Sequence, residues 1–194
     1  MKNLILIVFL TFAFLSCDIF TTRDAESPDQ ARSNYQTPVQ ASVVIENLKN
    51  SLSDKNVQNY IACFVDSLYS PQNFLFSASS EATAVYQIFL QGWGLYEEQR
   101  YISSVFNKVP DDYPISLTLS EENYSNLSGD SLIYSATYFL NIPVSSEGEA
   151  TTNYSGNLQF NMLRDSRALW VIYFWKDTKS QTLPSWSELK GSSY

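Results

Sequence analysis

The spacing of apolar residues changes once along the chain, and this change constrains the fold more than any other feature. Before Pro110 apolar residues recur at helical spacing, and the members of the strongest stripe are Val57, Tyr60, Ile61, Phe64, Val65 and Leu68. After Pro110 they alternate with polar residues, as in a half-buried strand. Helices followed by long antiparallel strands predict an α+β domain with its helices packed on one face of a sheet.

Caps and turns predict where the helices begin. A first helix starts with Thr37 as N-cap and Pro38 in its first turn. Asp54 caps a second helix, which follows the stripe to Leu68. Residues 81–91 fit a helix or a strand, and residues 93–106 fit a helix. On that last helix Leu95, Glu98, Ile102 and Val105 share one face.

The second half is predicted to form strands, after a short strand at residues 74–76. The strands cover residues 115–119, 131–143, 157–162 and 168–175, and residues 185–190 form a closing helical turn. Trp170 and Trp175 are an odd number of positions apart, so regular alternation places them on opposite faces of the last strand. At most one of them is then expected to line a pocket.

Composition excludes several classes of function. The 194 residues include no histidine, which removes Ser-His-Asp and Cys-His catalysis and histidine-ligated metals. Acidic residues outnumber basic ones 20 to 12, so the formal charge of −8 argues against nucleic-acid binding. The carboxylate pairs Asp111–Asp112 and Glu121–Glu122 lack the spacing of a calcium loop. We therefore expect no metal and no cofactor, and we assign no catalytic residue.

The N-terminus has the features of a targeting segment. Lys2 precedes an apolar run over residues 4–15, which is too short to span a bilayer and fits a signal peptide. The sequence Phe14-Leu15-Ser16-Cys17 resembles a bacterial lipobox. This resemblance implies a signal peptide over residues 1–16, which is removed, and lipidation of Cys17. An ordinary secretory signal is the alternative.

The expected organisation follows from that anchor. Residues 17–37 form the lipidated cysteine and a flexible tether, and residues 38–194 form one domain. The lipid holds the protein on a bacterial membrane in the cell envelope, and we expect the outer rather than the inner membrane. If Cys17 is acylated, Cys63 has no intramolecular partner, and its apolar neighbours predict a small buried side chain.

The order of the elements and three local motifs resemble the NTF2-like (SnoaL-like, cystatin-type) superfamily. The motifs are the helix end at residues 60–66, the hairpin from Gly156 through Asp177, and the ending Ser185-Trp186-Ser187-Glu188-Leu189-Lys190-Gly191. The ending is similar to that of uncharacterised bacterial lipoproteins. The resemblance implies helices packed into a curved sheet of four to five antiparallel strands, around a cone-shaped pocket. It also implies a homodimer through the convex face.

The cone pocket sets the candidate site. Five aromatic residues are expected to line it: Tyr60, Tyr134, Tyr138, Trp170 and Tyr173. Enzymes resembling ketosteroid isomerase place an Asp opposite a Tyr there. Here Asp66, Asp130, Asp165 and Asp177 stand at the ends of predicted elements, where capping and turn roles are common.

Three functions remain open at this point. We expect the domain to bind a small apolar ligand or an envelope protein partner without catalysis. The first alternative is an isomerase- or hydrolase-like enzyme that uses Tyr and Asp or Glu in the cone, and it requires a carboxyl group buried beside a Tyr hydroxyl. The second alternative is a structural subunit of an envelope complex.

Overall fold

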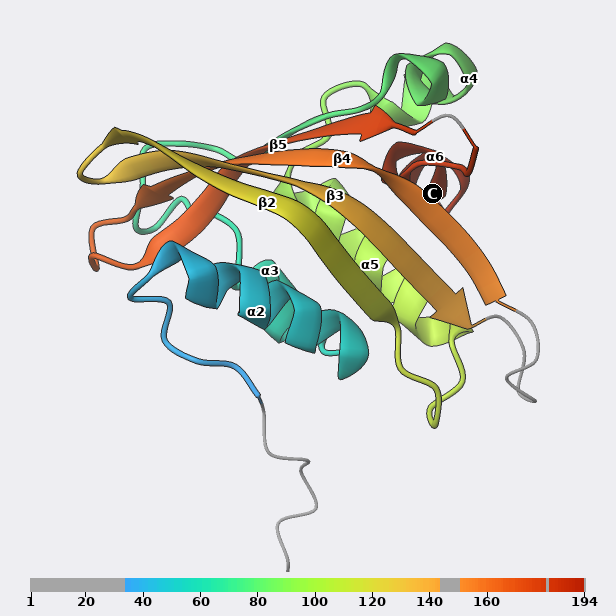
Figure 1. Ribbon diagram of the computed structural model, residues 1–194, viewed down its shortest axis with the longest axis horizontal. Coiled ribbons are helices and arrows are strands. Elements are labelled where there is room, and N and C mark those ends of the chain that lie inside the picture. The colour runs from blue at the N-terminus through green and yellow to red at the C-terminus, as the bar shows by residue number, and fades with distance from the viewer. Residues whose placement is uncertain (1–33, 144–150, 181, 194) are drawn as a thin grey trace, which may run out of the picture. The chain divides into compact units, whose positions relative to one another are not determined.

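The computed structural model describes residues 34–143, 151–180 and 182–193 (Figure 1). The predicted signal peptide, Cys17 and most of the tether lie outside these residues. The helices are α2 (Ala41–Ser53), α3 (Val57–Ile61), α4 (Ser80–Leu90), α5 (Leu95–Lys108) and α6 (Trp186–Ser192). The strands are β1 (Leu75–Ser77), β2 (Ser116–Ser128), β3 (Ser131–Pro143), β4 (Thr151–Arg164) and β5 (Trp170–Lys179).

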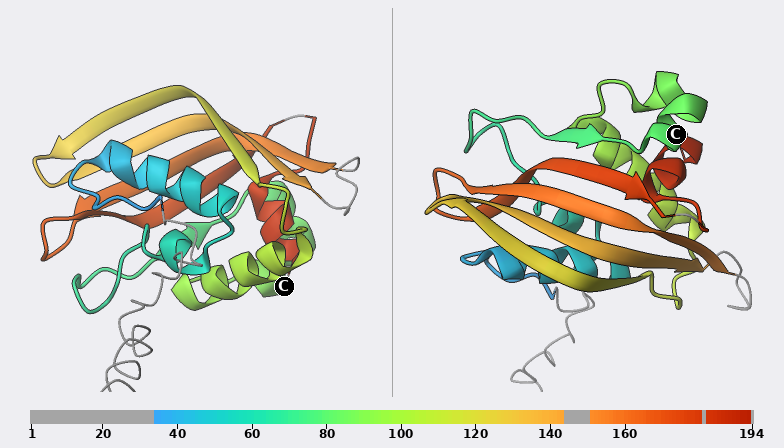
Figure 2. Two further views of the ribbon diagram at one scale, coloured as in Figure 1. Left: turned by 90° about the horizontal axis from the view of Figure 1, so that it is seen from below. Right: turned by 45° about the horizontal axis from the view of Figure 1, so that its top comes forward.

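The five strands form one sheet in the order β1-β5-β4-β3-β2. The strands β2 to β5 make an antiparallel meander, whereas β1 pairs with β5 in parallel, so the sheet is mixed rather than purely antiparallel. Its long strands arch over α2, α3 and α5 (Figure 2). The predicted α+β class with helices on one face of a curved sheet is therefore confirmed.

The second predicted helix is shorter than its apolar stripe. α3 ends at Ile61, and Phe64 forms a parallel bridge with Ile172 of β5. Ile172 exchanges two backbone hydrogen bonds with the residues on either side of Phe64. Because these backbone groups pair with the sheet, they are not available to a helix. The prediction of a helix to Leu68 is wrong, and Leu68 is 81% exposed.

The helix starts also differ from the predicted caps. α2 begins at Ala41, because the carbonyl of Pro38 accepts a hydrogen bond from the backbone N–H of Trp170. Asp54 ends α2, and Asn56 caps α3 by accepting a hydrogen bond from the backbone of Asn59. Residues 81–91, which fitted either structure, form most of α4.

The edge strand β2 is longer than predicted. It continues to Ser128 through a bulge at Glu121 and Glu122, and residues 120–128 are exposed. Glu121 has a φ of 54°, which lies in the left-handed region. The alternation of apolar and polar residues does not continue along this strand. The bulge places two residues opposite one residue of β3, so the side chains beyond it change faces.

A second bulge changes the faces of β5. The register moves from Asn161–Phe174 to Met162–Ile172, which leaves Tyr173 as the extra residue. Trp170 and Trp175 therefore lie on the same face of the sheet, and both are buried. The prediction of opposite faces is wrong. The extra residue in the bulge turns the side chains beyond it to the other face, so Trp175 points to the same side as Trp170.

The C-terminal helix α6 closes the core on the concave side. Trp186 and Leu189 of this helix are buried in the same hydrophobic core as the sheet residues Phe160 and Trp175. α4 packs against α6 (Figure 1) and contributes Ala82 and Leu90 to the same core. In the part of the chain that is described, no helix is both long and apolar enough to cross a bilayer.

We predict that Gly191→Ala destabilises the domain by about 1–3 kcal/mol, as other overpacked sites do. A Cβ at Gly191 meets Cγ of Tyr86 on α4 at 2.4 Å, so one of the two helices has to move. Urea unfolding measures the loss. Gly129→Ala is the matched control, because a Cβ there has nothing within 4 Å. Equal unfolding free energies for the two variants would contradict the close packing of α4 on α6.

Candidate functional site

A fully buried ion pair joins α5 to α6. Glu98 comes from the apolar face of α5, and Lys190 comes from the last turn of α6. Lys190 Nζ donates to Glu98 Oε2 at 2.5 Å, and both side chains have no exposed surface. A capping box between Ser185 and Glu188 fixes the start of α6, which places Lys190 over α5.

Both carboxylate oxygens of Glu98 receive further hydrogen bonds. The hydroxyl of Tyr60 donates to Oε1 at 2.7 Å, and Nε1 of Trp93 donates to Oε2 at 2.7 Å. Burial raises the pKa of Tyr60, and the charge of Glu98 adds to this effect, so the hydroxyl keeps its proton. Every donor on Glu98 thus comes from the protein itself.

Aromatic rings surround the ammonium group of Lys190. Its Nζ lies 3.7 Å from the ring centroid of Trp175 and 3.8 Å from that of Phe76. The rings of Trp93 and Tyr101 are each 5.4 Å away. Cation–π attraction compensates part of the hydration that the ammonium loses. Burial lowers the pKa of Lys190 to about 8, although Glu98 opposes this shift.

Asp177 forms a second buried cluster with the start of α6. The Tyr138 hydroxyl donates to its Oδ1 at 2.8 Å. The backbone N–H and the hydroxyl of Ser187 donate to its Oδ2, at 2.8 and 2.5 Å. Burial raises the pKa of Asp177, whereas Ser187, Tyr138 and Lys190 act in the opposite direction.

The cone of the sheet is therefore filled by the chain's own side chains. The two acid–tyrosine pairs, Glu98–Tyr60 and Asp177–Tyr138, are buried, and their carboxylate oxygens are bonded to protein donors. Proton transfer to a substrate requires that the base lie within hydrogen-bond reach of it. Both pairs also bond to α6, through Lys190 and Ser187, so they hold this helix in place.

An open groove lies on another side of the helices. It has a volume of about 690 Å³ and runs between the segment at residues 35–38, α3, the first turns of α5 and the start of β5. Its apolar lining consists of Pro38, Val57, Ile61, Ala62, Phe64, Leu95, Leu169 and Val171. A concave site with an apolar lining and a few polar groups is typical of small-molecule binding.

Polar groups stand around this apolar lining. Gln58 and Gln99 each contribute an exposed amide, and Arg167 contributes an exposed guanidinium group. Arg167 donates from Nε and Nη2 to Oδ2 of Asp165, at 2.9 and 2.5 Å. Burial acts to raise the pKa of Asp165, but the hydrogen bonds from Arg167 and from the backbone of Leu169 together lower it. Asp66 also lines the groove, so the positive charge of Arg167 is outnumbered by the negative charges of Asp66 and Asp165.

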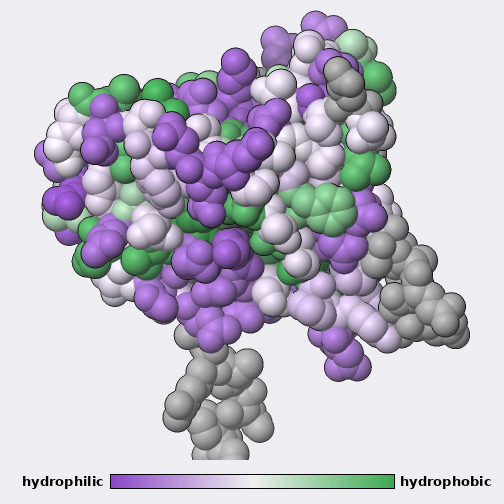
Figure 3. Space-filling model, in the orientation of Figure 1, coloured by the Kyte–Doolittle hydropathy of each residue, from purple (hydrophilic) through white to green (hydrophobic). Residues whose placement is uncertain are grey.

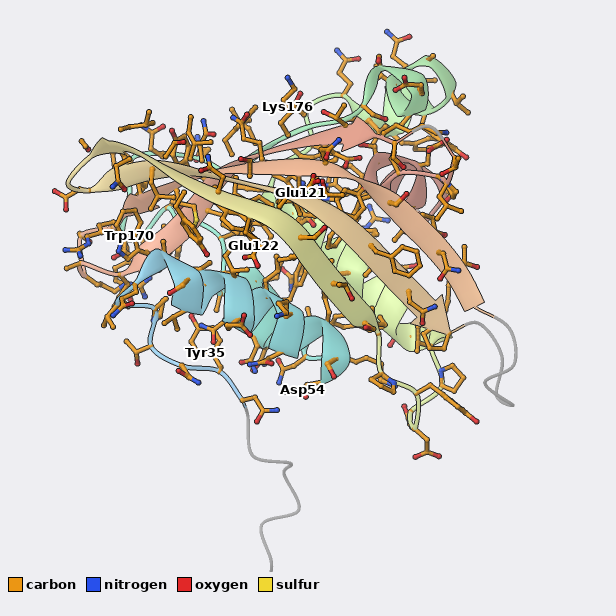
Figure 4. All side chains as sticks on the ribbon, viewed as in Figure 1. Tyr35, Asp54, Glu121, Glu122, Trp170 and Lys176 are labelled. Atoms are coloured by element: carbon orange, nitrogen blue, oxygen red, sulfur yellow. The ribbon has the colours of Figure 1, made fainter. Side chains whose placement is uncertain are left out.

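The five residues expected to line a pocket do not line this groove. Tyr60 and Tyr138 belong to the two buried clusters. Tyr134 is also buried, and its hydroxyl donates to Glu122 Oε2 at 2.8 Å. Trp170 is buried near the start of α2, beneath Arg164 (Figure 4), and Tyr173 is the half-buried bulge residue. Of these five residues, Tyr138 contacts α6 directly, since its ring packs against Trp186.

Sequence reasoning missed three of the charged residues inside the domain. The predicted apolar face of the helix over residues 93–106 includes Glu98. A carboxylate on such a face is the one signal in the sequence that the group is buried. The predicted strand ends at residue 175 and leaves Asp177 in a turn, whereas β5 continues to Lys179 and turns this side chain inward. Lys190 was placed on the closing helical turn, but its partner is 92 positions away in the sequence.

No set of three metal-ligating side chains gathers within the described residues. Cys63, which was predicted to be buried, has 1% of its surface exposed. Burial raises the pKa of its thiol, so the thiolate is disfavoured. The structure thus gives neither a metal centre nor an activated thiol in this part of the chain.

Comparison with known proteins supports the architecture. An NTF2-like protein of unknown function in nutrient uptake from Rhodospirillum rubrum aligns with a TM-score of 0.54 at 10% identity, covering 73% of this chain and 99% of that one. An NTF2-like superfamily protein from Salmonella enterica aligns with a TM-score of 0.51 at 11% identity, covering 72% and 88%. The domain has the NTF2-like fold.

A third solved structure carries an activity in its name. It is a protein from Streptomyces avermitilis, assigned provisionally as a dehydratase of the NTF2-like family, with a TM-score of 0.55 at 10% identity. The alignment covers 74% of this chain and 95% of that one. At such identities the likeness concerns the NTF2-like fold alone. No family model matches the sequence, and no curated protein matches it either.

We predict that Glu98→Gln lowers the free energy of unfolding by about 3–5 kcal/mol, because it leaves Lys190 buried without its anion. The double variant Glu98→Gln/Lys190→Met is expected to be more stable than Glu98→Gln alone, since it removes both charges. Urea unfolding measures both. Glu46→Gln is the control, because Glu46 pairs with Lys49 on the exposed face of α2. If Glu98→Gln costs no more than Glu46→Gln, the pair does not hold α6.

Stability is predicted to rise with pH through the range in which folded Lys190 loses its proton. Above pH 8 the folded state releases this proton, whereas an unfolded lysine keeps it to about pH 10.5. The unfolded state then binds more protons, so the free energy of unfolding increases, by at most about 1.4 kcal/mol per pH unit. Lys190→Met removes this contribution. The difference in unfolding free energy between the parent protein and this variant therefore separates the titration of Lys190 from that of the tyrosines. A difference that stays constant from pH 8 to 10 contradicts the lowered pKa.

Proposed function

We propose that this protein is a lipid-anchored binding protein of the cell envelope, whose NTF2-like domain takes a small apolar molecule in the groove beside α3. The observation that carries the proposal is the 690 Å³ groove with an apolar lining, next to a cone that the chain itself fills. No covalent step is included, because the buried carboxylates have no room for a substrate.

The chemistry of the groove favours a ligand without a strong charge. Arg167 is already paired with Asp165, and Asp66 lies in the same lining. An anionic ligand therefore gains little from the guanidinium and is repelled by Asp66. The amides of Gln58 and Gln99 supply neutral hydrogen-bonding groups beside the apolar lining.

Lipidation of Cys17 is part of the same proposal and rests on the lipobox resemblance. The described domain begins with the segment at residues 34–38, and one wall of the groove comes from this segment. The amide of Asn47 holds it through two hydrogen bonds to the backbone of Gln36, at 2.9 and 2.6 Å. A tether from Cys17 would therefore join the domain beside the groove.

The enzyme alternative has one observation in its favour. It required a carboxyl group buried beside a tyrosine hydroxyl, and Glu98–Tyr60 and Asp177–Tyr138 are such pairs. Their burial under α6 favours the binding proposal. An envelope protein partner, and a homodimer through the convex sheet face, stay predictions.

We predict that the domain binds the uncharged fluorophore N-phenyl-1-naphthylamine saturably, with one site per chain. Fluorescence titration measures the binding. Ala62→Trp places a large ring in the groove from the end of α3 and is expected to weaken binding at least about tenfold, which is 1.4 kcal/mol.

Ser42→Trp is the matched control, because Ser42 is exposed on α2 and lies outside the groove. This variant is expected to bind as the parent does. Absence of saturable binding, or equal binding by Ala62→Trp and Ser42→Trp, overturns the proposed site.

A further inference from the structure

A second pocket lies where four elements of the domain begin or end. It has a volume of about 350 Å³ and is lined by the last turn of α5, the end of β3, the start of β4 and the end of α6. The groove uses the first turns of α5 instead, and the two sites share no lining residue. Figure 2 shows α5 and α6 close together near one end of the sheet. The volume is at the lower end of the roughly 300–1,000 Å³ of small-molecule pockets, so the site suits a small ligand.

The pocket has an apolar floor and a polar rim. The floor consists of five buried residues, which are Val105, Val109, Ile142, Pro143 and Leu189. The rim consists of five residues that are half-buried or exposed, which are Lys108, Thr152, Tyr154, Ser192 and Ser193. A ligand that fits both parts therefore has an apolar body and a polar head group.

Lys108 gives the rim a positive charge. No ion pair of the described residues includes Lys108, and none of the ten described residues that line the pocket has a carboxylate. Lys108 lies in the last turn of α5, where the end of a helix carries about half a unit of negative charge. The full charge of the ammonium group exceeds this, so a net positive charge remains at this end of α5. In the groove, by contrast, Arg167 is paired with Asp165.

The hydroxyl groups of the rim are suited to a head group that accepts hydrogen bonds. Burial raises the pKa of Tyr154, so its hydroxyl keeps the proton and is able to donate it in a hydrogen bond. Thr152 and Ser193 add two further hydroxyl groups. An ionised carboxylate only accepts hydrogen bonds, and its charge is opposite to that of Lys108. A carboxylate therefore matches both the charge and the donors of the rim.

We propose that this pocket binds a small amphipathic carboxylate, of the size of a medium-chain fatty acid, as a second ligand of the domain. The carboxylate lies at the rim beside Lys108, and the apolar body lies on the buried floor. On the face of the molecule that Figure 3 shows, hydrophobic residues lie in small groups between hydrophilic ones. The floor of the pocket gives an apolar body more contact than a surface of that kind does.

Isothermal titration calorimetry with sodium octanoate tests this site. The protein is the chain from residue 17 onward, with Cys17→Ser to prevent acylation. We expect saturable binding with one site per chain. Octan-1-ol is the matched ligand, because it has a carbon chain of the same length without the charge. It is expected to bind more weakly than octanoate.

Lys108→Met keeps an unbranched apolar side chain and removes the charge. This variant is expected to weaken octanoate binding about three- to fivefold, as expected for a partly exposed ion pair, and to affect octanol binding less. Lys176→Met is the matched control, because Lys176 is exposed on β5 and lies outside this pocket (Figure 4). The control is expected to bind octanoate as the parent does.

Three results would overturn the proposal. The first is the absence of saturable octanoate binding. The second is that Lys108→Met weakens octanoate binding no more than Lys176→Met does, or weakens octanoate and octanol equally, since the charge then plays no part. The third is that Ala62→Trp abolishes octanoate binding while Lys108→Met retains it, because octanoate then binds in the groove.

This test is independent of the ligand that we propose for the groove. Titration with N-phenyl-1-naphthylamine is expected to give the same affinity in the presence of saturating octanoate, because the two sites share no lining residue. Failure of octanoate to bind leaves the proposed function of the groove standing. Failure of the fluorophore to bind leaves the result for the second pocket unchanged.

Discussion

The interior of the domain depends on the ion pair between Glu98 and Lys190. Removing two charges from water is costly, and the pair is stable only where the geometry is good and the remaining hydrogen-bonding groups are satisfied. Here Tyr60 and Trp93 complete the carboxylate, and the rings of Phe76 and Trp175 receive the ammonium group. These four partners come from α3, the connection before α5, β1 and β5, so the ion pair joins α6 to most parts of the domain.

The position of α6 has consequences on both sides of the domain. Inside, its residues bind both acid–tyrosine pairs through Lys190 and Ser187, and the groove that we propose as the binding site lies beside α3. On its other side α6 supports α4, because a Cβ at Gly191 would meet the ring of Tyr86.

Much of the fold was predictable because it depends on local patterns. The alternation in β3 and β4 and the helical spacing in α5 each arise from burial of one face, which a sequence window records. The stripe over residues 57–68 was misleading, because the same residues can pack against the core in a bent segment that pairs with β5. The faces of Trp170 and Trp175 were misjudged for a related reason, since one extra residue at Tyr173 reverses every side chain beyond it.

The sequence by itself determined the α+β class, the order of helices and strands, the burial of Cys63 and the lack of histidine chemistry. These properties depend on composition and on short periodicities, which do not change with the tertiary arrangement. Only the tertiary structure decided that Lys190 meets Glu98, that Asp177 faces inward and that the cone is filled while a groove beside it stays open. Those outcomes depend on contacts between residues far apart in the chain, and no local pattern specifies which of the chain's own side chains takes the space that a ligand could hold.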